Sequence, residues 1–210
     1  MGRYTEAKCR LCRRVGDKMM LKGERCYTAK CAMERRNVLP GYNSTGKRRP
    51  KKSERGLQLL QKQRARRTYG VLERQFRKMF GEAERLTGVT GDHFVVLLER
   101  RFDNVAYRLG FADSRAQARQ IISHGHLLVN GRRVNIPSYE VKANDLIAWR
   151  EESKKSEYFK TLVEKIADKI VPTWLNLDTG TMVGKVVNLP SRDDIEVKFE
   201  TKAIVEYYSR

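Results

Sequence analysis

The chain has 210 residues, of which 44 are Lys or Arg and 25 are Asp or Glu, so its formal net charge is +19 at pH 7. Hydrophobic residues make up 40% of the sequence, which excludes a fully disordered or collagenous chain and allows one or two small cores. No apolar run approaches the roughly 18 residues that span a bilayer, and no secretory leader is visible, so we expect a cytoplasmic protein without a membrane partner.

All four cysteines lie within the first 31 residues. The spacing C-x2-C-x13-C-x4-C, formed by Cys9, Cys12, Cys26 and Cys31, allows four thiolates to converge tetrahedrally on one ion. We predict a structural zinc site, because four cysteines leave no open coordination position for chemistry. An iron–sulfur cluster uses the same ligands and stays open as the alternative. A disulfide framework is typical of secreted chains, and a thioredoxin-like pair would need a βαβ context, so both are disfavoured.

Basic residues surround the cysteines and continue beyond them. After Arg36 comes NVLPGYNSTGKRRPKK, in which proline and glycine break regular structure while lysine and arginine concentrate charge. Residues 41–55 are predicted to form an extended basic strap that can follow a groove of nucleic acid. The alternative is a plain flexible linker.

Two helices are predicted next. Leu57, Leu60 and Ala65 give a weak apolar stripe beside several cations, and after Gly70 an apolar residue recurs every four positions, at Leu72, Phe76 and Phe80. The GVTG sequence at residues 88–91 then marks a break.

Residues 92–150 contain the most regular pattern. Apolar residues from Phe94 to Leu109 predict one amphipathic helix, which ends at Gly110 in a left-handed cap. Ser114 and Gln117 form a capping box that opens a second helix, running to Gly125. Asn130-Gly131 between two apolar runs is a strong hairpin signal, which predicts strands at 127–129 and 132–134, and a further strand is expected at 146–149.

Polar residues of this part have predicted roles. Arg115 and Arg119 lie one turn apart near a helix start, where they could form a phosphate platform, and Arg132 and Arg133 occupy the hairpin tip. Asp103 and Arg115 are interpreted as an internal ion pair. His124 and His126 either cap a helix end or contact RNA.

The remaining residues are nearly neutral, since residues 151–210 carry −1 whereas residues 1–55 carry +12. A helical stripe runs from Phe159 to Ile170, and short β-rich runs follow at 183–187 and 195–199. Acidic residues here would repel phosphate, so this part is expected to meet protein neighbours or solvent.

The sequence LERRFDNVAYRLGFADSRAQARQIISHGHLLVNGRRVNIPSYEV resembles the RNA-binding module named after ribosomal protein S4. Together with RYTEAKCRLCRR, LKGERCYTAKCAMERR, YGVLERQFRKMF and the terminal IVEYYSR, it extends the resemblance to the zinc-carrying bacterial S4 family over nearly the whole chain. The resemblance implies an α+β fold with a four-cysteine zinc knuckle (1–40), the basic strap (41–55), a helical domain (56–91, joined by 190–210) and an RNA-binding module with a helix and antiparallel sheet extension (92–189). It also implies a short helix at 203–208.

The family function implied is that of a structural component of the small ribosomal subunit. Such a protein binds 16S rRNA at a multi-helix junction, nucleates assembly, and lines the channel by which messenger RNA enters, beside ribosomal proteins S5 and S3. The resemblance places zinc on Cys9, Cys12, Cys26 and Cys31. The predicted RNA-binding residues are Arg3, Arg10, Arg13, Arg14, Lys22, Arg25, Lys30, Arg35, Arg36, Lys47, Arg48, Arg49, Lys51, Lys52, Lys62, Arg64, Arg66, Arg67, Tyr69, Arg74, Arg77, Arg115, Arg119, His124, His126, Arg132 and Arg133.

Two other classes of protein share some of these features. Pseudouridine synthases carry a similar module but need a large catalytic domain, and only 60 residues follow Arg150. A zinc-bearing DNA-binding regulator would share the charge, but no coiled-coil heptads or paired half-site device is visible. Since no nucleophile motif or phosphate loop is present either, we expect neither an enzyme nor a small-molecule substrate.

Overall fold

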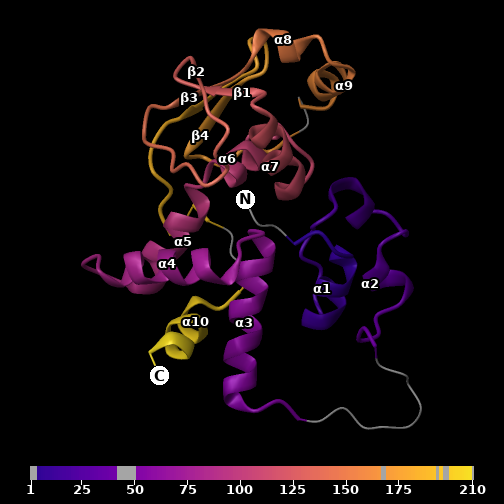
Figure 1. Cartoon of the computed structure of the whole chain (residues 1–210), viewed down its shortest axis with the longest axis vertical. Helices are drawn as coiled ribbons and strands as arrows, with labels where there is room; N and C mark the ends of the chain where they lie inside the picture. The colour runs from indigo at the N-terminus through magenta and orange to yellow at the C-terminus, as the bar shows by residue number, and fades with distance from the viewer. Residues whose placement is uncertain (1–3, 42–50, 167–168, 193, 196–198, 210) are drawn as a thin grey trace. The chain divides into compact units, whose positions relative to one another are not determined.

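The computed structural model describes residues 4–41, 51–166, 169–192, 194–195 and 199–209. Two compact units are present: residues 1–94 with 197–210, called here the helical unit, and residues 95–196, called the sheet unit. The chain therefore leaves the helical unit at residue 94 and returns to it at residue 197 (Figure 1). No helix in the described ranges is both long and apolar enough to cross a membrane.

The helical unit begins with short elements around the cysteines: α1 (Lys8–Val15), a 3-10 turn (Gly23–Cys26) and α2 (Ala32–Arg35). Helix α1 ends at Gly16, whose φ of 87° is the left-handed conformation that glycine adopts without strain. A small core of Cys12, Val15 and Met19 packs against Leu60, so this segment has its own apolar contact with the next helix.

Three longer helices complete this unit: α3 (Glu54–Thr68), α4 (Glu73–Glu84) and α10 (Thr201–Tyr208). The predicted helices at 57–67 and 72–80 are confirmed, and the helix implied for 203–208 is present. Helix α10 packs beside α3 (Figure 1). Phe80 contacts the rings of Phe94 and Tyr208 at centroid distances of 5.5 Å and 4.5 Å, which joins the end of the chain to the core.

The single helix predicted from Phe94 to Leu109 is wrong, because two helices occupy this region: α5 (Thr90–Glu99) and α6 (Phe102–Arg108). Arg101 between them is extended, with ψ of 134°. The N–H groups of Phe102 and Asp103 donate to carbonyl oxygens of residues 139 and 137, at 2.8 Å and 3.1 Å. These long-range hydrogen bonds satisfy two backbone donors at the start of α6, and no local sequence pattern predicts them.

Helix α7 (Arg115–His124) follows the predicted signals closely. Ser114 Oγ accepts a hydrogen bond from the N–H of Gln117, and Gly125 closes the helix with φ of 75°. The Gln117 side chain accepts from the N–H of Asp113, so the reciprocal bond of the capping box falls one residue earlier than expected.

A five-stranded antiparallel sheet, in the order β2-β1-β3-β5-β4, forms the centre of the sheet unit. Its strands are β1 (Leu127–Val129), β2 (Arg132–Arg133), β3 (Leu146–Trp149), β4 (Leu175–Asp178) and β5 (Val183–Val186). Asn130 and Gly131 both have positive φ, as the predicted hairpin turn requires. The predicted strands at 127–129, 132–134, 146–149 and 183–187 are thus confirmed, whereas 196–198 lie outside the described residues.

Helices α6 and α7 pack on the sheet, and α8 (Glu151–Lys154) and α9 (Glu157–Ile166) follow β3. The core joins Phe102, Leu109 and Ile122 to sheet residues such as Ile147 and Val186. A Cβ atom on Gly184 would lie 2.5 Å from Leu109 Cδ1, so the absence of a side chain there lets β5 approach α6.

Candidate nucleic-acid interface and cysteine site

The four cysteines come from three elements and line one small cavity. Cys9 and Cys12 lie on α1, Cys26 ends the 3-10 turn, and Cys31 caps the start of α2. All four are free thiols, and three of them are buried. Lys8, Lys18 and Lys22 also line the cavity, which surrounds the sulfur atoms with positive charge.

This donor set suits a soft divalent cation, since thiolates are the preferred ligands of zinc in structural sites. Burial raises the pKa of Cys12, and the neighbouring Cys26, Cys9 and Cys31 raise it further, against a lowering hydrogen bond at Met19. The N–H of Lys22 donates to Cys26 Sγ at 3.3 Å. In the described part of the chain, however, no group of three or more Cys, His, Asp or Glu side chains is positioned to hold a metal ion. Zinc therefore stays a prediction.

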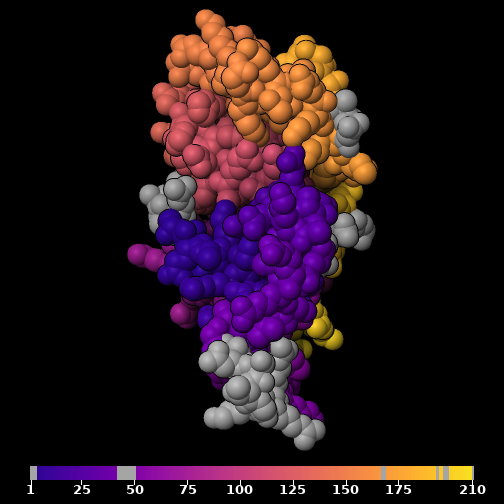
Figure 2. Space-filling view, turned by 90° about the vertical axis from the view of Figure 1, so that its right-hand side faces the viewer, coloured from indigo at the N-terminus to yellow at the C-terminus, as the bar shows by residue number. Residues whose placement is uncertain are grey.

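Exposed cations cover the N-terminal segment, residues 4–41, which forms a continuous indigo and violet patch in Figure 2. Arg13 is half-buried, and its Nη1 lies 3.5 Å from the carbonyl oxygen of Val38. The predicted RNA-binding residues of this part that are exposed are Arg10, Arg14, Lys22, Arg25, Lys30, Arg35, Arg36, Lys51 and Lys52. Arg3, Lys47, Arg48 and Arg49, with most of the predicted strap, lie outside the described residues.

Two residues predicted to contact RNA in the helical unit are instead part of its interior. Lys62 is 6% exposed, forms an ion pair with Glu73, and lies over the ring of Tyr207 at 4.8 Å. Tyr69 is 4% exposed and packs edge-on against Phe199. Both side chains have internal partners and little accessible surface, so neither is retained in the interface. On α4, Arg74 and Arg77 are exposed as a contact would require.

Glu73 makes the helical unit sensitive to acid. Burial raises its pKa, but hydrogen bonds from Lys62 and from the Tyr208 hydroxyl, at 3.0 Å, together with the charges of Lys62 and Arg66, bring the pKa below its ordinary value of 4.5. A carboxyl group whose pKa is lower in the folded state stabilises the fold above its unfolded pKa. That contribution is lost as the pH falls through the folded pKa.

We expect the free energy of unfolding to fall as the pH drops below the ordinary carboxyl pKa of 4.5, and to fall less in Glu73→Gln. Urea unfolding at several pH values, followed by circular dichroism, measures the slope of the free energy of unfolding against pH for the wild type and for Glu73→Gln. Glu157→Gln is the control, because Glu157 is 88% exposed. A wild-type slope equal to that of Glu73→Gln would contradict the assignment.

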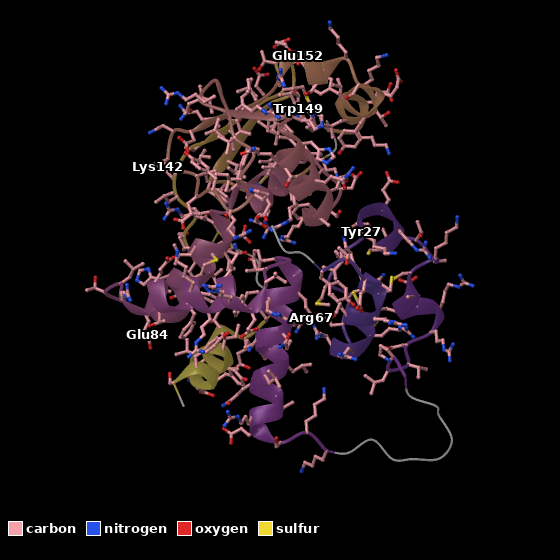
Figure 3. The ribbon with its side chains drawn as sticks, viewed as in Figure 1. Tyr27, Arg67, Glu84, Lys142, Trp149 and Glu152 are labelled. Carbon is pink, nitrogen blue, oxygen red and sulfur yellow. The ribbon has the colours of Figure 1, made fainter. Side chains whose placement is uncertain are left out.

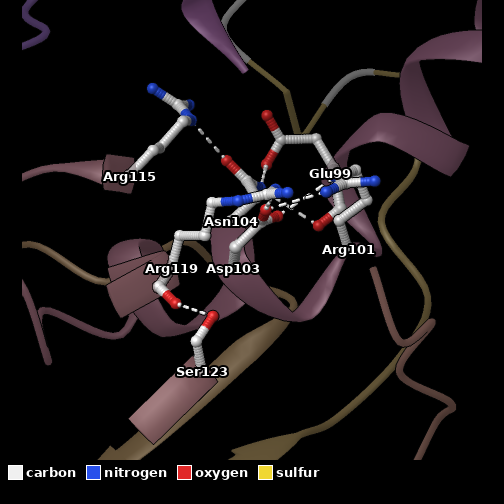
Figure 4. Close-up of polar contacts among 7 residues, drawn as sticks. All are labelled: Glu99, Arg101, Asp103, Asn104, Arg115, Arg119 and Ser123. Carbon is white, nitrogen blue, oxygen red and sulfur yellow. Dashed lines mark hydrogen bonds and ion pairs between the residues drawn. The ribbon is translucent and has the colours of Figure 1, made fainter. Parts of the chain in front are cut away.

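In the sheet unit, the two arginines predicted to form a phosphate platform have different environments (Figure 4). Arg119 is 8% exposed, and its Nη1 contacts Asp103 Oδ2 at 3.1 Å, so it belongs to the interior. Arg115 is half-buried, donates to Asn104 Oδ1 at 2.7 Å, and lies 4.6 Å from the Tyr107 ring centroid. Asp103 pairs with Arg101 and Arg119, in place of the expected pair with Arg115.

The same network extends to the end of α5, where sequence reasoning missed it. Glu99 is fully buried, receives two hydrogen bonds from Arg108 at 2.8 Å and 3.0 Å, and accepts from Asn104 Nδ2 at 2.6 Å. Asn104 thus links the Glu99 carboxylate to the Arg115 guanidinium. The signal in the sequence was the alternation of acids and arginines in LERRFDN, to which the sequence analysis gave no structural role beyond an internal pair at Asp103.

The hairpin tip gathers cations around the end of α7. Arg132 and Arg133 are exposed, and Arg133 Nη2 donates to the carbonyl oxygen of His124 at 3.3 Å. His126 Nδ1 lies 2.9 Å from Ser153 Oγ. Burial, then the charges of His124, Arg133 and Arg150, lower the pKa of His126. Arg150, which the sequence analysis missed, lies at the same end of α7, where its N–H donates to the carbonyl oxygen of His126 at 2.9 Å and its guanidinium pairs with Glu152.

Comparisons with known proteins agree over the whole chain. A family model described as the ribosomal protein S4/S9 N-terminal domain matches residues 3–99, and one described as the S4 domain matches residues 100–147. The chain is 54% identical to the small ribosomal subunit protein uS4 of Pelotomaculum thermopropionicum and to that of Desulforamulus reducens. It is 55% identical to the protein uS4A of Alkaliphilus oremlandii, and each alignment covers 100% of both chains.

Proposed function

The chain belongs to the ribosomal protein S4 family, and from that premise we propose that it binds 16S rRNA at a multi-helix junction and nucleates assembly of the small subunit. It is a small-subunit ribosomal protein and not an enzyme. The observation that supports the proposal best is the separate cationic surface on each unit: the exposed cations of the N-terminal segment, and the exposed Arg132 and Arg133 of the β1–β2 hairpin.

The binding mechanism follows from this arrangement. Guanidinium and ammonium groups neutralise phosphates and release counterions, which supplies most of the affinity without reading sequence. Two surfaces on folded units can contact different RNA helices, so the shape of a junction becomes the source of specificity. A protein that binds such a junction early would fix the mutual angles of its helices, which is what nucleation of assembly requires.

The remaining expectations complete the proposal. The four cysteines would hold zinc, with an iron–sulfur cluster as the alternative, and the ion would keep the short elements of the N-terminal segment folded. Residues 151–195 lack the charge excess of the rest of the chain and would face ribosomal proteins S5 and S3. The protein would help to line the path of incoming messenger RNA on a cytoplasmic ribosome.

A titration against protein-free 16S rRNA at physiological salt tests the proposal. Equal masses of duplex DNA and of an unrelated structured RNA serve as competitors. We expect binding that survives both competitors, because junction shape contributes beyond charge. Binding that both competitors abolish would contradict specific recognition and leave charge as the only interaction.

A further inference from the structure

The cysteine cavity shares one of its walls with the contact between α1 and α3. Cys12 lines the cavity, and it also belongs to the small core with Val15 and Met19 that packs on Leu60 of α3. Leu21 has the same double position, since it lines the cavity and packs against that core. Figure 3 shows sulfur atoms, in yellow, gathered around α1. A change at the Cys12 sulfur therefore acts on both sides of this wall.

The backbone of Cys12 makes a second connection to α3. The Cys12 carbonyl oxygen accepts hydrogen bonds from the N–H groups of Gly16 and Asp17, at 2.8 Å and 3.3 Å. The Asp17 carboxylate in turn forms an ion pair with Arg64 of α3. Helix α1 is thus held on α3 by an apolar contact and by an ion pair, and Cys12 takes part in the first and positions the second.

Cys9 is the thiol of this cavity that an oxidant can reach. The other three cysteines are buried, whereas Cys9 is half-buried. Lys18 and Lys22 line the same cavity, so the sulfur atoms lie in positive surroundings. Partial exposure, nearby cations and a second cysteine within reach are the features that redox-sensing cysteines share.

Helix geometry makes Cys12 the second cysteine for Cys9. The two residues are three positions apart on α1, and both line the cavity, whereas Cys26 and Cys31 come from separate elements. At this spacing on a helix the Cβ atoms are about 5–6 Å apart, while a disulfide needs about 3.5–4.5 Å. Closing the bond therefore distorts the first turn of α1 and draws the Cys12 side chain away from the core.

We propose that Cys9 is a site of oxidation by hydrogen peroxide, that it forms a reversible disulfide with Cys12, and that this bond releases the N-terminal segment from α3. The Cys9 sulfur attacks one peroxide oxygen, the O–O bond breaks, and a sulfenic acid and water result. The Cys12 sulfur then attacks the Cys9 sulfur, and the sulfenic oxygen leaves as a second water molecule. Overall, the two thiols lose two electrons and two protons, and the peroxide is reduced to two water molecules.

The consequence for RNA binding rests on the proposed function. The disulfide uses two of the four sulfur ligands proposed for zinc, so the site would also lose its ion. The exposed cations of residues 4–41 would then lose their fixed position beside α3, and a surface that is not preorganised binds more weakly. Disulfides of proteins in reducing compartments are usually transient, and many of them sense oxidants. Oxidation of Cys9 would thus lower the affinity for RNA.

The test treats the wild-type protein with hydrogen peroxide and then removes the excess oxidant. We expect the mass of the denatured chain to fall by two hydrogen atoms, and peptide mapping to join Cys9 to Cys12. Hydrogen exchange of the α1 amides should become faster, and the affinity for protein-free 16S rRNA should fall at least about tenfold. Dithiothreitol should reverse all of these changes, whereas oxidised methionine needs an enzyme for its reduction.

Two variants that each lose one thiol separate the proposed pair from a general effect of cysteine loss. Cys31→Ser keeps both partners and should still form the disulfide. Cys12→Ser removes the partner, so Cys9 should gain oxygen atoms instead. Both variants are scored by mass and peptide mapping alone, because either can loosen the N-terminal segment. The affinity comparison stays within the wild type, oxidised against reduced.

The outcomes are distinguishable. Reduced wild-type protein that fails to bind rRNA specifically overturns the proposed function, and the disulfide and the exchange of α1 are still measured without RNA. A disulfide between other cysteines, or none, overturns the assignment of Cys9 and Cys12. The expected disulfide with unchanged exchange of α1, or with unchanged affinity in a protein that binds rRNA specifically, overturns the release from α3.

Discussion

Replacing Asp103 with alanine is expected to lower the free energy of unfolding of the sheet unit by about 3–5 kcal/mol. The Asp103 carboxylate receives hydrogen bonds from Arg101 Nε and Nη2 and from Arg119 Nη1, at 2.8–3.1 Å. The Arg101 side chain is only 3% exposed, so its charge would remain buried without the carboxylate. Breaking a buried ion pair costs more than the pair contributes, because the remaining charge cannot return to water.

Urea unfolding followed by tryptophan fluorescence measures this loss, since Trp149 and Trp174 both belong to the core of the sheet unit. Asp113→Ala is the control, because Asp113 is 33% exposed and lies 3.7 Å from Lys169 in a weaker pair. It is expected to cost less than about 1 kcal/mol. A loss of similar size in both variants would show that the Asp103 network contributes no more than a surface pair.

The second large effect concerns the cysteines. Cys9→Ser is expected to abolish stoichiometric zinc and to loosen residues 4–41, while the sheet unit keeps its stability. Structural zinc contributes about 10–16 kcal/mol to the folding of zinc-finger peptides, far more than the small core of Cys12, Val15 and Met19 can supply. Cys9 is half-buried and lies outside that core, so the variant removes a ligand without removing core packing.

Elemental analysis of the protein measures its zinc content, and hydrogen exchange of the α1 amides measures how far residues 4–41 have loosened. Wild-type protein treated with a strong chelator should reproduce the exchange pattern of Cys9→Ser, because both lack the ion. Iron with visible absorbance in the wild type would favour the iron–sulfur alternative. Full zinc content in Cys9→Ser would contradict a site made of four thiolates.

Local sequence signals were sufficient to predict the structure wherever the backbone conformation depends on residues adjacent in the chain. Asn130-Gly131 encodes its turn through backbone preference, and Ser114 and Gly125 define both ends of α7 in the same way. The clustering of the cysteines within one short stretch likewise predicted that they would meet around one cavity.

Sequence reasoning failed where distant residues decide the outcome. The break at Arg101 depends on carbonyl groups of residues 137 and 139, which no helical periodicity reveals. Charge was interpreted as surface at Lys62 and Arg119, yet each is buried beside an acid from another element. Composition predicts how many cations a chain has, but only tertiary packing determines which of them remain available to a partner.

The discontinuous helical unit has a consequence for protein synthesis. Ile204 of α10 is fully buried, yet the ribosome makes it only after residues 95–196 have been translated. At about 5–20 residues per second, the completed α4 waits roughly 6–24 s for this partner, and α3 waits longer. The sheet unit can therefore complete its core on the nascent chain, while the part made first finishes folding last.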